Sequence, residues 1–207
     1  MMNGLWGKKI GMTQIFSDDY KVVPVTAIDL AQWYITQIKT IEKDGYAAVQ
    51  LGNVKARYHE QPFSLSWLQE PKKYFSALKE VRLNEEMPGL AVGSQADIGS
   101  ILAKGDSIDA FGVTKGAGFQ GVVKRHSFTG GRASHGSTLG RATGSLSFMR
   151  SRGRVIKGKR MPGHMGVEAC VIKNLEIVRI EPAAHIVFVK GSVPGKSGSL
   201  IFLKKCR

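Results

Sequence analysis

Cysteine is scarce in this chain of 207 residues, because only Cys170 and Cys206 occur, and no CxxC spacing is present. That scarcity excludes a disulfide framework and gives no sign of a zinc site. No apolar run approaches the roughly 20 residues that a membrane-spanning helix needs. The first residues, MMNGLWGKKIGM, lack the apolar stretch of a signal peptide. We therefore expect a soluble protein of a reducing compartment that is not exported and binds no membrane.

Acidic residues are missing from one long internal window, since Asp109 and Glu168 bracket 58 residues without a carboxylate. This cationic window, residues 110–167, carries 11 of the chain's 14 excess positive charges. The other 149 residues hold 19 basic and 16 acidic side chains, which is ordinary for a globular surface. Solvated protein faces normally mix both signs, so a window of one sign predicts contact with a polyanion, and we expect nucleic acid.

Large apolar side chains are also sparse in the cationic window, which holds 13 of the 25 glycines. Their spacing is too irregular for collagen or for a flexible linker. Such a segment cannot bury enough apolar surface to offset an ordering entropy of about 1 to 2 kcal/mol per residue. We expect it to be mobile alone and to order along a polyanion, where glycine lets the backbone approach phosphates.

The flanks of the window show the pattern of short strands separated by tight turns. The expected strands are residues 5–16, 21–28, 33–40, 46–52, 107–113, 171–180, 185–191 and 199–205. Residues 71–83, PKKYFSALKEVRL, begin with proline and place Tyr74, Leu78 and Arg82 at helical spacing, which predicts a short helix. The expected fold class is mostly β: a small closed antiparallel β-barrel with a short helical insertion and a long, irregular, cationic extension.

A phosphate-binding loop is excluded at VKGSVPGKSGS, residues 189–199. The motif GxxxxGK[ST] requires glycine where Lys190 stands. The segment that follows, SLIFLKK, reads as a strand, whereas a P-loop is followed by a helix. We expect a Pro-Gly turn between two strands here and no small-molecule substrate.

Three histidines lie in the cationic window, at His126, His135 and His164. Catalytic imidazoles need an orienting carboxylate or a nucleophile, and a zinc site wants four closely spaced ligands. The window offers no acid and no cysteine, so we expect no catalytic residue, no metal and no cofactor. We expect these histidines to donate hydrogen bonds to phosphates or to stack on bases.

Phenylalanines at positions 119, 128 and 148 alternate with the cations. Aromatic rings among Arg and Lys stack on unpaired bases, each worth about 1 to 3 kcal/mol. The same rings could instead pin the root of the window to the barrel, and the sequence leaves both roles open.

Several stretches closely resemble the family of bacterial-type large-subunit ribosomal protein L3. They are GLWGKKIGMTQIF at 4–16, EKDGYAAVQLG at 42–52, TKGAGFQGVVKRHSFTGG at 114–131, SHGS at 134–137 and GRVIKGKRMPGHMG at 153–166. The resemblance covers the N-terminal strand, most of 105–167 and the PGKSG turn, and is looser over 53–104.

The resemblance implies a six-stranded barrel on the large-subunit surface, with an extension that threads through ribosomal RNA toward the peptidyl transferase centre. It implies binding of 23S-type rRNA early in assembly, contact with neighbouring large-subunit proteins, a cytoplasmic or organellar ribosome, and no enzymatic activity. The expected barrel body is residues 1–111 and 167–207, with 53–90 a partly helical insertion. The expected extension is residues 112–166.

The residues expected to bind rRNA lie in the first strand and along the extension. They are Lys8, Lys9, Lys115, Phe119, Lys124, Arg125, His126, Arg132, His135, Arg141, Arg150, Arg152, Arg154, Lys157, Lys159, Arg160 and His164.

The chain departs from the family pattern near the tip, at Gly140, Thr143, Arg150 and Arg152. Arg150 stands where the family has a glutamine that many bacteria methylate, so that modification is not expected. Our hypothesis is that the two added arginines replace contacts made differently elsewhere. An Arg150→Gln variant that assembles and dissociates in salt like the parent would contradict it.

Other functions remain open at this stage. A free basic RNA chaperone, nucleoid protein or ribosome assembly factor would have a similar composition, but would not stay on one particle. An RNA-processing enzyme would need carboxylates or a nucleophile near the extension, which the acid-free window does not supply. Peripheral membrane binding would need an amphipathic helix.

Overall fold

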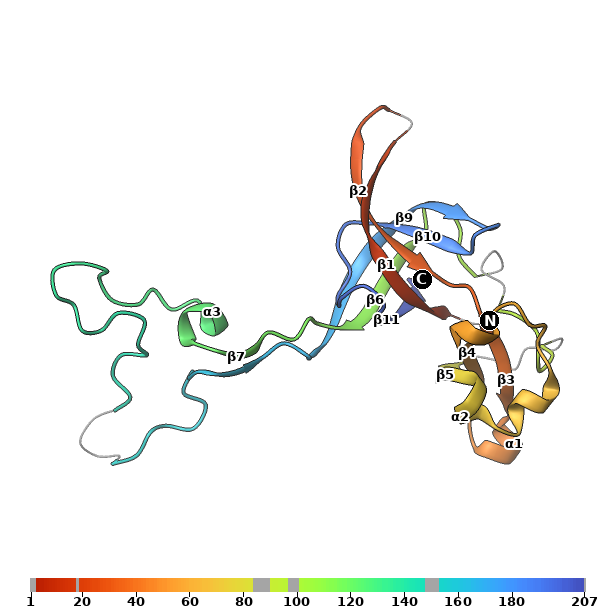
Figure 1. The fold of residues 1–207 in the computed structure, drawn as a ribbon, viewed down its shortest axis with the longest axis horizontal. Helices are drawn as coiled ribbons and strands as arrows, with labels where there is room; N and C mark the ends of the chain where they lie inside the picture. Colours follow the sequence, from red (N-terminus) through yellow and green to blue (C-terminus); the bar gives the residue numbers. More distant parts are fainter. Residues whose placement is uncertain (1–2, 18, 84–89, 97–100, 148–152, 207) are drawn as a thin grey trace. The chain divides into compact units, whose positions relative to one another are not determined.

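A computed structural model describes residues 3–17, 19–83, 90–96, 101–147 and 153–206 of the chain (Figure 1). The chain divides into two compact units. Unit 1 is Met1–Val113 with Ala169–Arg207, and unit 2 is Thr114–Glu168. No helix in the described ranges is long and apolar enough to cross a membrane.

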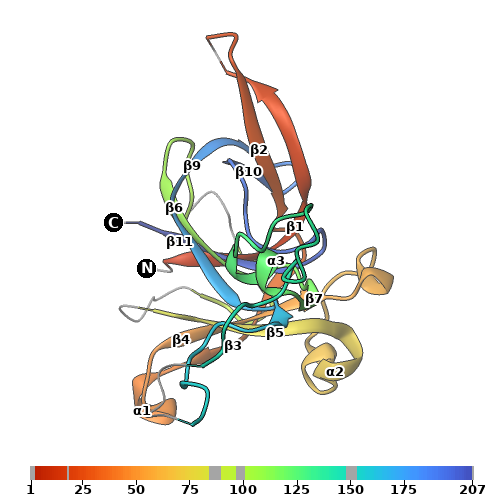
Figure 2. The ribbon, with the colours of Figure 1, turned by 90° about the vertical axis from the view of Figure 1, so that its left-hand side faces the viewer.

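Six strands of unit 1 form a hydrogen-bonded antiparallel ring in the order β1, β11, β6, β9, β10, β2 (Figure 2). Their bounds are β1 Gly4–Phe16, β2 Val22–Asp29, β6 Ser107–Val113, β9 Ala169–Glu181, β10 Ile186–Lys190 and β11 Leu200–Lys205. All six were predicted from sequence, and the structure confirms them as strands. The long β1 pairs with β11 over residues 4–8 and with β2 over residues 8–16.

Fully buried aliphatic side chains from the ring strands belong to one hydrophobic cluster. They include Ile28, Ile108, Ile177, Val187, Val189, Ile201 and Leu203. Val187 and Val189 on β10 are two residues apart, as are Ile201 and Leu203 on β11, because alternate side chains of a strand point to the same face. Each buried side chain of this size stabilises the fold by about 1.5 to 3 kcal/mol.

A second antiparallel sheet of unit 1 has the order β3-β4-β5. Its strands are β3 Trp33–Lys39, β4 Ala48–Val54 and β5 Phe75–Arg82, and the helix α1 Ile41–Asp44 joins the first two. Trp33, Ile35, Leu51 and Val81 from this sheet belong to the same buried cluster as the ring. The two sheets of unit 1 therefore share one core.

The predicted helix over residues 71–83 is wrong beyond its first turn. Pro71 opens a helix, α2 Pro71–Tyr74, as proline at the first helical position favours. The chain then becomes β5, which pairs with β4 and buries Phe75 and Val81. Phe75, Ala77 and Val81 follow a period of two, and the gain from sheet pairing outweighs the helical spacing of Tyr74, Leu78 and Arg82.

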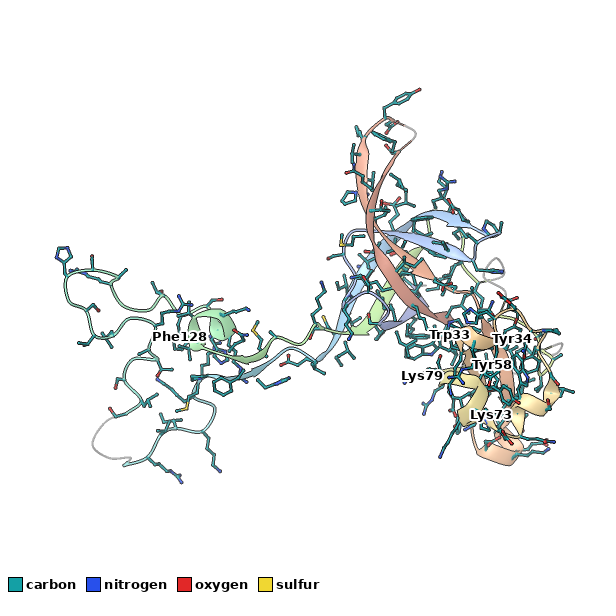
Figure 3. All side chains as sticks on the ribbon, viewed as in Figure 1. Trp33, Tyr34, Tyr58, Lys73, Lys79 and Phe128 are labelled. Atoms are coloured by element: carbon teal, nitrogen blue, oxygen red, sulfur yellow. The ribbon has the colours of Figure 1, made fainter. Side chains whose placement is uncertain are left out.

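The segment between β4 and β5 is held by an aromatic cluster. It contains the short 3-10 helices η1 Ala56–Tyr58 and η2 Leu65–Leu68. Trp67 stacks on Tyr74 with ring centroids 5.2 Å apart, and Tyr34 stacks on Phe63 at 5.1 Å. Tyr34 and Tyr58 both pack against this cluster, and Figure 3 labels them in this part of unit 1. Ring packing thus fixes a segment with little regular structure.

Unit 2 has few regular elements. They are the paired strands β7 Gly118–Gln120 and β8 Gly163–Met165, and the helix α3 Val122–His126. The described residues 127–147 and 153–162 contain neither helix nor strand. The abundance of glycine and the small number of large apolar side chains in this region explain why.

Candidate nucleic-acid interface

The two limbs of unit 2 meet first through backbone hydrogen bonds near its ends. The amide of Thr114 donates to the carbonyl of Glu168 at 2.9 Å, and the amide of Ala117 donates to Met165 at 2.9 Å. Gly166 has φ +83°, and a Cβ there would collide with the carbonyl oxygen of Lys115. Only glycine therefore permits this close approach of the limbs.

Arg125 and His126 at the end of α3 tie one limb to the other. The Nη1 group of Arg125 donates to the carbonyl oxygen of Met161 at 2.8 Å, and Nε2 of His126 lies 3.2 Å from the same oxygen. Since a carbonyl can only accept, Nε2 of His126 is the donor. A Cβ at Gly163 would meet the Arg125 guanidinium, so glycine also makes room for this contact. Both side chains are half-buried.

Most of the other predicted RNA-binding residues of unit 2 are exposed. They are Lys115, Phe119, Lys124, Arg132, His135, Arg141, Arg154, Lys157, Lys159, Arg160 and His164. Arg150 and Arg152 lie outside the described residues. The structure therefore presents a series of exposed cations along both limbs.

No cation in the described part of unit 2 lies within salt-bridge distance of a carboxylate. The ion pairs of the described residues join Lys39 to Glu80, Lys73 to Glu70, Arg179 to Glu181, Lys190 to Glu176 and Lys205 to Asp106, all in unit 1. The difference follows from the acid-free window, and it leaves the positive charge of unit 2 without internal neutralisation.

Phe119 is the most exposed of the described phenylalanines, with 76% of its surface accessible. It lies opposite His164 in the β7–β8 ladder, so both side chains point to the same face of this two-stranded ribbon. An exposed aromatic ring beside an imidazole provides a surface on which an unpaired base can stack.

Phe128 is half-buried and lies beside α3 (Figure 3). Its ring centroid is 6.2 Å from that of His126. It lines a hollow of about 430 Å³ in unit 2, together with Thr143, Leu139 and Arg160. Phe128 therefore packs inside unit 2, whereas Phe119 is free to stack on a partner. Phe148 lies outside the described residues.

The two lysines predicted in the first strand differ in exposure. Lys8 is half-buried, whereas Lys9 is only 7% exposed. The ammonium of Lys9 donates to the carbonyl oxygens of Val193 at 2.6 Å and Gly195 at 3.2 Å. These bonds hold the turn before β11 against β1. That Lys9 reaches rRNA stays a prediction.

The described residues contain no group of three or more His, Cys, Asp or Glu side chains that could hold a metal. The loop at 189–199 joins β10 to β11, as predicted. Near the tip, the amide of Gly131 donates to the carbonyl of Gly140 at 2.6 Å, so one departure from the family pattern takes part in a backbone contact.

Sequence reasoning did not identify the residues that join the limbs of unit 2. Met161, Gly163 and Gly166 act through a carbonyl oxygen and through the absence of a side chain, which charge patterns do not reveal. The one available signal was the facing glycine pairs of KGAG at 115–118 and GHMG at 163–166, which would permit close backbone contact.

Comparison with known proteins points to one family. A family model for Ribosomal protein L3 matches residues 86–185. The chain is 42% identical over 208 residues to Large ribosomal subunit protein uL3 of Pelotomaculum thermopropionicum, which covers 99% of this chain and 97% of that protein. It is 39% identical over 209 residues to the protein of the same name from Listeria monocytogenes, with the same coverage. The chain belongs to the ribosomal protein L3 family.

Proposed function

We propose that this chain binds large-subunit, 23S-type rRNA directly and early in assembly, mainly through residues 112–166. Membership of the L3 family makes the chain a structural constituent of the large ribosomal subunit, not an enzyme. Its partners are large-subunit rRNA and neighbouring ribosomal proteins, and its place is in the ribosome of the cytoplasm.

One observation carries the proposal. The exposed cations of unit 2 face no carboxylate in the described residues, while the ion pairs of unit 1 neutralise charge within that unit. A polyanion that supplies phosphates is the partner that balances such a surface, and release of its counterions drives binding. Glycine at the close approaches lets the limbs lie side by side, as a segment packed between RNA helices requires.

The proposal assigns different tasks to the two units. Residues 1–111 and 167–207 form the body, whose ring of six strands is a small closed antiparallel barrel of the translation-protein type. Residues 112–166 form the extension that enters the RNA toward the peptidyl transferase centre. The exposed predicted residues contact phosphates and bases there, while Arg125 and His126 keep the two limbs together.

Sedimentation tests the proposal most directly. A cell lysate is washed in high salt and run through a sucrose gradient, and this chain is followed by mass spectrometry. We expect recovery in one copy per large subunit. Recovery at the top of the gradient would instead favour the alternative, a free basic RNA chaperone or assembly factor.

A further inference from the structure

The outer half of the β1–β2 hairpin extends past the ring. β1 leaves β11 after residue 8, and β2 pairs with β10 only over residues 25–29. Among the described strands, residues 11–16 of β1 therefore pair only with β2, and residues 22–24 of β2 pair only with residues 14–16 of β1. Figure 1 shows this hairpin rising beyond the other strands of unit 1.

One face of this outer hairpin, residues 10–24, is exposed and mostly apolar. Met12, Gln14 and Phe16 alternate along β1 and so point the same way, and the register sets Phe16 opposite Val22 and Gln14 opposite Pro24. The exposed fractions are 54% for Met12, 71% for Phe16 and 53% for Val22. Such a strip of neighbouring exposed apolar side chains marks a surface that is covered in an assembly.

The turn of the hairpin adds an aromatic ring. Tyr20 is 91% exposed, the highest value among the exposed large hydrophobic residues. The amide of Tyr20 donates to the carbonyl of Ser17 at 2.9 Å, and the amide of Ser17 donates to Lys21 at 2.9 Å. These bonds hold the backbone of Tyr20 to Ser17 and that of Ser17 to Lys21, so the ring is presented at the end of the hairpin. Exposed Tyr is typical of protein interfaces.

The charge of the outer hairpin argues for a protein partner and against RNA. Residues 10–24 contain two carboxylates, Asp18 and Asp19, and one ammonium, Lys21, so their net charge is −1. The cationic window carries +11 in the same chain. Phosphate contact depends on Lys and Arg, and the apolar face of the hairpin has neither.

A hollow beside the hairpin could receive a partner side chain. It measures about 470 Å³ and is lined by Ile15, Phe16 and Ser17 of the hairpin, by Lys104 and Gly105 before β6, and by residues 176–179 of β9. The charges of β9 there are balanced within unit 1, because Glu176 pairs with Lys190 at 2.9 Å and Arg179 pairs with Glu181 at 3.0 Å.

We propose that the outer hairpin docks this chain against a neighbouring protein of the large subunit. The partner patch is apolar, receives Phe16 and Tyr20, and carries basic residues at its rim opposite Asp19. This inference rests on the proposed function, since it assumes that the chain is assembled in the subunit. Unit 2 would then face RNA while the hairpin faces protein.

Site-specific photocrosslinking in assembled large subunits tests the inference. Benzoylphenylalanine replaces Phe16 in one variant and Phe119 in a matched control, because both rings are aromatic and similarly exposed. We expect the adduct at position 16 to contain a different ribosomal protein and the adduct at position 119 to contain rRNA. An rRNA adduct, an adduct with a second copy of this chain, or no adduct at position 16 would each overturn the inference.

Sedimentation of the same variants separates this inference from the proposed function. Variants that sediment with the subunit but give the wrong adduct contradict the docking surface alone. Variants found only at the top of the gradient contradict the proposed function and with it the inference.

The double variant Phe16→Ser, Tyr20→Ser provides a second measurement. Subunits that contain it should lose the neighbouring protein severalfold more readily in high salt, whereas subunits with Leu65→Ser, a change at an exposed apolar residue of η2, should keep it. Equal retention would overturn the inference.

Discussion

The guanidinium of Arg125 donates to the carbonyl oxygen of Met161 at 2.8 Å and so links two positions 36 residues apart in the chain. The outgoing limb of unit 2 thereby holds the returning limb through a cation that sequence reasoning had assigned to RNA alone. A guanidinium has five N–H donors, so the same side chain can hold Met161 and still contact phosphate.

Replacing Arg125 should therefore weaken RNA binding more than the loss of one charge does. A hydrogen bond to a charged group is worth about 1.5 to 3 kcal/mol, so Arg125→Ala should lower affinity for an rRNA fragment roughly 10- to 100-fold beyond the effect of Lys124→Ala. Lys124 is the matched control because it is the exposed neighbour on the same helix. Filter binding at fixed salt measures both, and equal losses would contradict a structural role for Arg125.

Gly166→Ala should open the root of unit 2. The new Cβ would collide with the carbonyl of Lys115, and φ +83° costs a non-glycine residue about 1 to 2 kcal/mol. The amides of Thr114 and Ala117, which bond across the limbs, should then exchange hydrogen faster. Gly121→Ala is the control, since nothing lies within 4 Å of its Cβ position. Unchanged exchange in Gly166→Ala would disprove the close approach.

Removing residues 115–160 should leave unit 1 folded and remove most of the salt dependence of RNA binding. We assume that about 8 of the 11 cations contact phosphates and that each contact adds about 0.7 to the slope of log affinity against log salt. The logarithm of the affinity should then fall with the logarithm of the salt concentration at a slope near 5 to 6. Circular dichroism checks the fold, and a salt titration checks the slope. A slope that survives the deletion would place binding on unit 1.

Lys9→Ala should destabilise unit 1. The buried ammonium donates to Val193 and Gly195, and loss of hydrogen bonds from a charged group costs about 1.5 to 3 kcal/mol in the free energy of unfolding. Lys8→Ala, a half-buried neighbour, should cost less. Urea unfolding compares the two. If Lys9→Ala lowers RNA affinity with no loss of stability, Lys9 contacts rRNA in place of the turn.

Asp106 should contribute to the acid sensitivity of unit 1. The Lys205 ammonium at 2.6 Å, with a backbone hydrogen bond from Ala103, holds the pKa of Asp106 below its usual value. A lowered folded-state pKa stabilises the protein above the unfolded-state pKa, and this stabilisation is lost as pH falls below about 4. The pair is partly exposed, so the effect is under about 1 kcal/mol.

Asp106→Asn should therefore lower stability at neutral pH and flatten the fall in stability between about pH 4 and pH 2. Glu60→Gln, at an exposed position, serves as the control and should change neither. Thermal unfolding across this pH range gives the comparison. If the stability of Asp106→Asn falls between about pH 4 and pH 2 as steeply as that of the parent, other carboxylates account for the acid sensitivity of unit 1.

Strand positions were predictable because alternating apolar residues between turn signals define them locally. Eight predicted strands, from residues 5–16 to residues 199–205, are present. The helix over 71–83 failed because Phe75 and Val81 gain more by pairing with β4 than the local spacing indicates. Local sequence pattern predicts neither the pairing of β5 with β4 nor the short β7–β8 ladder, because both depend on which distant segments of the chain come together.

The candidate site was predictable in charge but not in contact. Sequence showed that residues 110–167 are cationic, because the sign of a side chain needs no fold. It could not show that Lys9 turns inward or that Arg125 bonds Met161. Those outcomes depend on carbonyl oxygens, which every residue carries and no sequence pattern distinguishes.

Unit 2 leaves unit 1 at Val113 and returns at Ala169, and these two residues are register partners in the β6–β9 ladder. In the topology of unit 1, unit 2 is therefore the loop of a single hairpin formed by β6 and β9. The entropy of closing a loop grows only with the logarithm of its length, so a long insertion costs little more than a short one. Unit 1 can therefore fold with little penalty for the length of unit 2, and in the proposed function a body that is already folded presents unit 2 to the RNA.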